Sequence, residues 1–120
     1  MESARFERLV QQALGGIPQE LSTYLDNVDL VVEDWPTREQ LAGSGIEDGQ
    51  YLLGLYEGIP LTERYGYDMV LPDKITLFQK PIEAVGSSEE ETVKEVRDTV
   101  VHEVAHHFGI DDYRLKEMGA

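Results

Sequence analysis

The chain contains no cysteine among its 120 residues. Disulfide bonds are therefore excluded, and so are a nucleophilic thiol and a metal site built from thiolates. A metal ion in this chain would have to be held by imidazoles and carboxylates, which the sequence supplies as three histidines and 24 aspartates and glutamates.

Positive charge is scarce as well. Ten Lys and Arg against 24 Asp and Glu give a formal net charge of −14 at pH 7. This charge opposes attraction to phosphate backbones and to anionic membranes, so we expect neither nucleic acid nor a membrane as a partner. A basic peptide or protein is a more plausible partner, although acidity that only serves solubility is the simpler explanation.

Long apolar runs are also missing. No stretch reaches the length of a transmembrane helix, and residues 1–8 carry charges where a secretory signal requires an apolar run. We therefore expect a cytoplasmic protein. The length and a hydrophobic content of 41% indicate one globular domain over residues 1–120.

The apolar residues follow helical spacing in some segments and strand-like patterns in others. The predicted elements are helices over residues 3–14 and 18–25, one or two helical turns after Pro36, a loop at 43–45, and strands over 28–33, 51–56 and 74–79. Pro72 and Pro81 flank the third strand, which places it at an edge of the sheet, where it could pair with an extended peptide. Gly54 within the second strand indicates a bulge or a close neighbour.

A long helix is predicted from Ser88 to a sharp turn at Gly109. Ser88 and Glu91 form a capping-box pattern at its start, and three glutamates lie at the positive end of the helix dipole. Valines recur every three or four residues along it, at positions 93, 96, 100 and 104, and predict a buried stripe.

The end of this helix contains the pattern HExxHxxGxxD. All three histidines of the chain fall within six consecutive residues. His102 and His106 are one helical turn apart, nearly opposite the valines, so both imidazoles can reach one zinc ion. Glu103 follows the first histidine at the position of a general base for a zinc-activated water. Gly109 can end the helix in the left-handed conformation and return Asp112 to the ion, which completes a catalytic set of three protein ligands.

Other residues near the motif have weaker signals. Asp111 is the rival of Asp112 as third ligand, with an orienting role as its alternative. His107 is expected to turn toward the valine stripe as a partly buried structural residue, and Thr99 is expected to pack. The candidates for a group that stabilises an oxyanion, by residue type alone, are Arg64, Tyr65, Tyr67, Tyr113 and Arg114.

Two segments resemble the small bacterial zincin-like metallopeptidases, sometimes called minimal zincins: LPDKITLF at residues 71–78 and TVVHEVAHHFGIDD at residues 99–112. Chain length and the order of the predicted elements are similar too. The resemblance implies an α+β fold with a small twisted mixed sheet, whose antiparallel edge strand packs on a long active-site helix. It also implies one zinc held by His102, His106 and Asp112 with Glu103 as general base, as in zincins whose third ligand is an aspartate.

The sequence therefore predicts a zinc-dependent metallopeptidase that hydrolyses peptide bonds of a peptide or protein substrate. The acidity, and the eight residues after Asp112, leave open a catalytically weak or inactive zincin-shaped module for protein interaction. A metal-dependent ribonuclease shares the histidine spacing, but Glu103 and the net charge of −14 disfavour it. The sequence leaves the oligomeric state open, a homodimer included.

Overall fold

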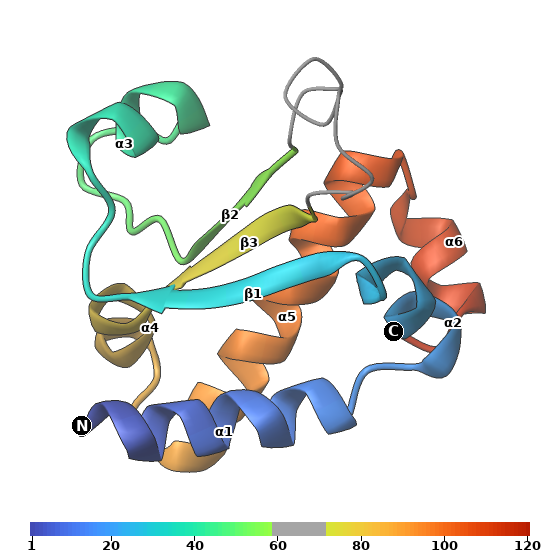
Figure 1. The fold of residues 1–120 in the computed structure, drawn as a ribbon, viewed down its shortest axis with the longest axis horizontal. Coiled ribbons are helices and arrows are strands. Elements are labelled where there is room, and N and C mark those ends of the chain that lie inside the picture. The colour runs from blue at the N-terminus through green and yellow to red at the C-terminus, as the bar shows by residue number, and fades with distance from the viewer. Residues whose placement is uncertain (59–71) are drawn as a thin grey trace.

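The computed structural model describes residues 1–58 and 72–120. Its centre is a three-stranded sheet of β1 (Val28–Glu33), β2 (Gly54–Glu57) and β3 (Asp73–Phe78), in the order β1-β3-β2. β3 runs parallel to β1 and antiparallel to β2, so the sheet is mixed (Figure 1). These strands and the helices around them confirm the predicted α+β class.

The prediction that residues 74–79 form an edge strand is wrong, because β3 is the central strand. Ile75 pairs with Leu30 on one side and with Tyr56 on the other. Neither flanking proline interferes: Pro72 precedes the first paired residue, and Pro81 already lies in α4 (Gln79–Val85). Among the strands that the structure describes, β1 and β2 are at the edges of the sheet, and β2 is the antiparallel one.

The predicted helices lie where the sequence places them, but the structure adds two more. The helices of the first half are α1 (Ser3–Gly15), α2 (Gln19–Ser22), the 3-10 turn η1 (Thr23–Leu25) and α3 (Arg38–Ser44). The expected loop at 43–45 is mostly the end of α3, and Gly45 closes it at a φ of 73°. α4 was not predicted, nor was α6 (Asp112–Glu117). None of the described helices is long and apolar enough to span a bilayer.

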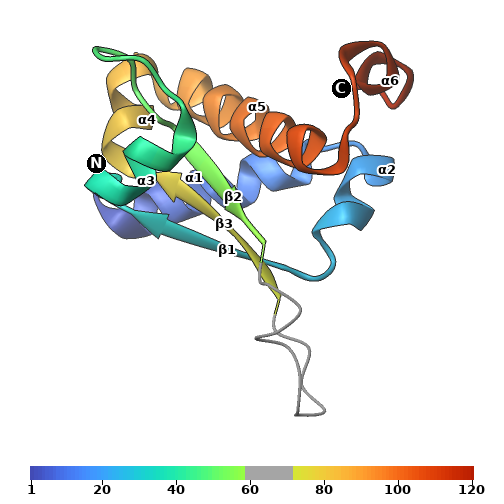
Figure 2. The ribbon, with the colours of Figure 1, turned by 90° about the horizontal axis from the view of Figure 1, so that it is seen from above.

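The long helix is α5 (Glu89–Phe108), which lies along one face of the sheet, with α1 packed against it (Figure 2). Its start differs from a full capping box. The Ser88 hydroxyl accepts from the Glu91 amide at 3.1 Å, but the Glu91 carboxylate accepts from the Ser87 amide and hydroxyl instead of the Ser88 amide. The helix start is stabilised by both serines.

The core lies between α5, α1 and the sheet. Val96, Val100 and Val104 are buried, which confirms the predicted stripe, whereas Val93 is half-buried at its rim. They pack with Phe6 of α1 and other apolar residues, among them Val10, Ile75, Leu77 and Ile82.

β2 lies unusually close to α5. A Cβ on Gly54 would stand 2.6 Å from Cγ2 of Thr99 and 3.2 Å from the carbonyl oxygen of Thr76. The close neighbour expected at Gly54 is therefore Thr99, a buried residue that also packs as predicted. Its hydroxyl donates to the Glu95 carbonyl at 2.7 Å, so only its methyl faces the strand.

Substitution of Gly54 by alanine should destabilise the protein by about 1–3 kcal/mol, because the added methyl group overpacks the contact with Thr99. Thr99→Ser removes the opposing methyl and keeps the hydroxyl, so Gly54→Ala should cost less in the Thr99→Ser background. Urea unfolding of the four proteins measures this coupling. Equal costs in the two backgrounds would contradict the contact.

Candidate functional site

Gly109 ends α5 as predicted. Its φ of 70° is left-handed, and the Ile110 amide donates back to the Ala105 carbonyl at 2.8 Å. This pattern reverses the chain at a glycine, and Ile110 then packs on the core. The residues after the turn begin α6 at once.

His102 and His106 lie on the solvent side of α5, opposite the buried valines. Both are exposed, while Val100 and Val104 beneath them are buried. The two histidines are four positions apart in the helix, which places them on one face a single turn from each other. Both histidines thus lie on one exposed face of α5, as the spacing predicts, and their role as ligands stays a prediction.

Glu103 is half-buried where β2 meets α5. Its Oε1 accepts a hydrogen bond of 3.0 Å from the Tyr56 backbone amide. Burial raises the pKa of the Glu103 carboxyl above its ordinary value, and the Tyr56 amide and the charges of His106 and His102 act against that rise. Both imidazoles therefore act on this carboxylate.

Asp111 and Asp112 occupy different positions at the start of α6. Asp111 is the N-cap, and its Oδ1 accepts from the Arg114 amide at 2.8 Å. Asp112 is the first residue of the helix, is exposed, and has no part in the cap. Asp111 therefore has a structural role as the N-cap, while the choice of Asp112 as the third ligand stays a prediction.

The residues fit a zinc ion in their chemistry, since two imidazoles of one helix face and a carboxylate beyond Gly109 are typical zinc donors. They are not gathered around one point: within residues 1–58 and 72–120, no three His, Asp or Glu side chains lie close enough together to hold a metal ion. The ligand set of His102, His106 and Asp112 stays a prediction.

His107 does not turn toward the valine stripe, and this expectation is wrong in direction. Its ring stacks on that of Tyr56, with 3.9 Å between centroids and 18° between planes. Its side chain is 38% exposed, and Nε2 lies 3.9 Å from Oδ2 of Asp73. The reason is β2, which covers the side of the helix next to the histidine pair.

Tyr56 is the site residue that the sequence did not indicate. Besides its amide bond to Glu103, its hydroxyl donates to Asp73 at 2.7 Å. No motif surrounds it, and its importance comes from the packing of β2 on α5, which no local pattern reveals.

The candidates for oxyanion stabilisation gain no support. Arg64, Tyr65 and Tyr67 lie outside the described residues. Tyr113 is 75% exposed, and Arg114 lies 3.3 Å from Glu20. Among the described residues, neither Tyr113 nor Arg114 forms a hydrogen bond or an ion pair with Glu103.

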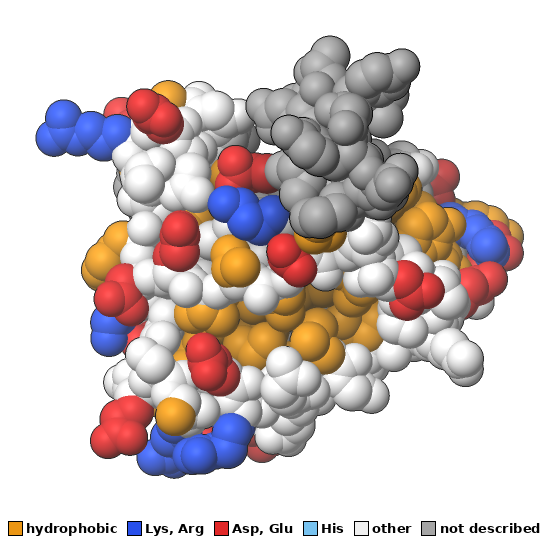
Figure 3. All heavy atoms as spheres, viewed as in Figure 1, with side chains coloured by type: hydrophobic (Ala, Val, Ile, Leu, Met, Phe, Trp, Pro, Cys, Tyr) orange, Lys and Arg blue, Asp and Glu red, His pale blue; other side chains and the backbone are white. Residues whose placement is uncertain are grey.

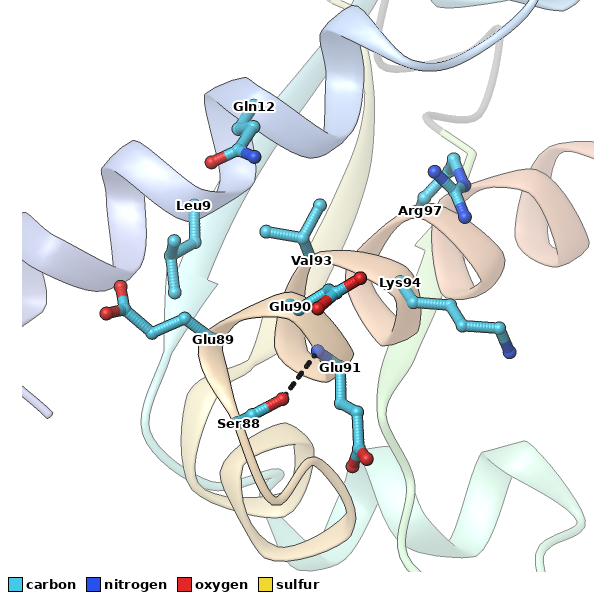
Figure 4. A pocket seen from close by; sticks show the side chains of 9 residues that line it. All are labelled: Leu9, Gln12, Ser88, Glu89, Glu90, Glu91, Val93, Lys94 and Arg97. Carbon is cyan, nitrogen blue, oxygen red and sulfur yellow. Dashed lines mark hydrogen bonds between the residues drawn. The ribbon is translucent and has the colours of Figure 1, made fainter.

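Two larger cavities lie away from the histidines. One, of about 780 Å³, is an apolar hollow between α1 and β1, where hydrophobic side chains such as Leu14, Leu30 and Val32 gather (Figure 3). The other, of about 750 Å³, lies between α1 and the start of α5, near Gln12, Lys94 and Arg97 (Figure 4). Neither is lined by a predicted site residue.

Comparison with known proteins gives two findings. Residues 25–120 match the family model described as zincin-like metallopeptidase. The fold is similar to that of a conserved hypothetical protein from T. thermophilus, with a TM-score of 0.56 and 21% sequence identity over 90% of this chain and 94% of that one. At that identity the likeness shows the fold alone. No curated protein matches the chain.

Asp111→Ala should destabilise the protein by about 1 kcal/mol, because α6 loses its N-cap. Asp112→Ala removes only an acidic residue of the first turn and should cost a few tenths of a kcal/mol at most. Urea unfolding in the presence of a chelator measures both. The reverse order of the two losses would contradict the roles assigned to the aspartates.

Glu103→Gln should stabilise the metal-free protein at pH 8, and the gain should shrink as the pH falls. The folded state raises the pKa of Glu103 above its unfolded value. The carboxyl therefore costs no stability below the unfolded pKa, and the folded protein loses stability as the pH rises from there through the folded pKa. Glutamine keeps the acceptor for the Tyr56 amide and cannot ionise. Unfolding midpoints between pH 4 and pH 8 test this, and a pH-independent difference would speak against a raised pKa.

Proposed function

Because the chain belongs to the family of zincin-like metallopeptidases, whose model matches more than half of it, we propose that it is a zinc-dependent peptidase. His102, His106 and Asp112 hold the ion, and Glu103 is the general base. The observation that carries the proposal is Glu103: a half-buried carboxylate, influenced by both imidazoles and held by an amide of the neighbouring strand.

The histidines suit zinc because imidazoles on one exposed helix face can bind it without rearrangement of the core. When bound, zinc polarises a carbonyl and makes a water acidic enough to attack near neutral pH. Asp112 lies beyond the turn at Gly109, is exposed, and is not the residue that caps α6, so we expect its side chain to turn toward the pair when zinc binds. Its partner in sequence, Asp111, keeps α6 in place.

Glu103 takes and returns the proton. A carboxylate with a raised pKa is a better proton acceptor near neutral pH than an exposed glutamate. The Tyr56 amide engages Oε1, which leaves Oε2 to exchange a proton with the attacking water and then with the leaving amine.

The substrate is a peptide or protein, and an extended segment of it pairs with main-chain groups of β2 other than the Tyr56 amide, which donates to Glu103. Strand addition is proposed at β2 and not at β3, because β2 is the edge strand beside α5 among the strands that the structure describes. The net charge of −14 favours substrates with basic residues. The cytoplasmic location stays a prediction, and the oligomeric state stays open, a homodimer included.

The second candidate is a zincin-shaped interaction module without turnover. One observation favours it: within the described part of the chain, the three predicted ligands are not gathered into one cluster. Metal content and turnover separate the two candidates.

The test uses protein purified without chelator, its zinc content measured by mass spectrometry, and cleavage of fluorescein-labelled casein. Wild type should hold close to one zinc per chain and cleave casein. Glu103→Gln should keep the zinc and lose at least about a hundredfold in kcat, whereas His102→Ala should lose both zinc and turnover.

His107→Gln is the matched control, since His107 is adjacent to the pair and is not a predicted ligand. It should keep close to one zinc. Full activity in Glu103→Gln would overturn the role of the base, and wild-type protein that holds zinc but cleaves no casein would favour the interaction module.

A further inference from the structure

β2 and α5 meet in a regular register. Three pairs of residues face each other across this junction: Gly54 and Thr99, Tyr56 and Glu103, and, just after β2 ends, Gly58 and His107. Each step advances two residues in the strand and four in the helix. Two residues of strand span about 6.8 Å and four of helix about 6.0 Å, so the two elements stay in step over this length.

Glycine is what permits the first of these contacts, since a Cβ at Gly54 would overlap Thr99. At the third, a Cβ on Gly58 would stand 3.5 Å from Cε1 of His107, an ordinary packing distance. Between them, Tyr56 has a side chain and contacts the helix through its main chain as well. The strand and the residue after it therefore lie against three successive turns of α5, and the hydrogen bond to Glu103 lies at the middle one.

The Tyr56 amide, which donates to Glu103, takes no part in the hydrogen bonds between β2 and β3. In an antiparallel pair, opposed residues alternate between bonded and non-bonded pairs. The Phe78 amide donates to the Leu53 carbonyl at 2.9 Å, which makes that pair a bonded one. Tyr56, three residues on, belongs to a non-bonded pair with Ile75, so its amide points away from β3.

The Tyr56 side chain fixes the strand at this point. Its hydroxyl donates to Oδ2 of Asp73, the first residue of β3, and its ring stacks on His107 of α5. One residue is thus tied to the central strand and to the helix while its amide holds the carboxylate between them.

We infer that Tyr56 is the positioning residue for Glu103. Its amide fixes one carboxylate oxygen, and its side chain keeps that amide in place. A glutamate without this bond would sample several rotamers, and few of them would aim the second oxygen at the attacking water. The catalytic consequence rests on the proposed function, whereas the hold on Glu103 does not.

Amide hydrogen exchange of the metal-free protein tests the hold directly. The Tyr56 amide should exchange at least about tenfold more slowly in wild type than in Glu103→Ala. The Leu55 amide, which faces β3, should be equally protected in both. Equal exchange at Tyr56 in the two proteins would overturn the inference, whether or not the protein is a peptidase.

A pair of substitutions isolates the amide. Tyr56→Ala and Tyr56→Pro both remove the ring, but only proline removes the N–H, and no bond to β3 is lost with it. We compare Tyr56→Ala with Tyr56→Pro in the wild-type background and again in the Glu103→Ala background. Strain that proline adds to the strand is the same in both backgrounds and cancels in this comparison. Proline should lower the urea midpoint further than alanine only when Glu103 is present; the same difference in both backgrounds would overturn the inference.

Turnover of fluorescein-labelled casein tests whether the positioning of Glu103 by Tyr56 contributes to catalysis. Tyr56→Phe keeps the ring stacking and loses the bond to Asp73, so kcat should fall about threefold to tenfold while KM and zinc content stay the same. A change in KM alone would overturn the positioning role. If wild type shows no turnover, the proposed function fails, and the exchange at Tyr56 still decides whether the strand holds Glu103.

Discussion

The close packing of β2 on α5 is the constraint from which the character of the site follows. Gly54 allows the strand to reach the helix at Thr99, and the strand then covers the side of the helix that carries Glu103. Burial at this junction raises the pKa of the carboxyl, and the Tyr56 amide supplies it with a hydrogen bond in return. A strand further away would leave Glu103 as one more exposed glutamate in an acidic protein.

α5 serves the core and the surface at the same time. Its valines anchor it against α1 and the sheet, so the histidines on the other side stand on a rigid support. Sites on regular elements keep their geometry better than sites on loops. The third predicted ligand differs in this respect: Asp112 opens a short helix after a glycine turn, and α6 is anchored by Leu115 and Met118.

The parts of the site that lie within one helix could be predicted from the sequence. Histidine spacing, the valine stripe and the left-handed glycine are local properties, and the structure agrees with each of them. The position of β3 could not be predicted, because prolines beside a strand are compatible with an edge and also with a central strand that they do not interrupt. Tyr56 and the stacking of His107 depend on which strand lies beside α5, which is a long-range property. The side chains at 64, 65 and 67 lie outside the described residues, so their predicted roles stay predictions.

The family and the fold agree with a metallopeptidase, and the chemistry of the donors agrees with zinc, but catalysis requires that these donors converge. The most direct measurement is anomalous scattering at the zinc edge from crystals grown with one equivalent of zinc. We predict a single peak at about 2.0–2.2 Å from a nitrogen of His102, a nitrogen of His106 and an oxygen of Asp112. A peak at another place, or none within reach of the two histidines, would contradict a zinc centre built from these residues.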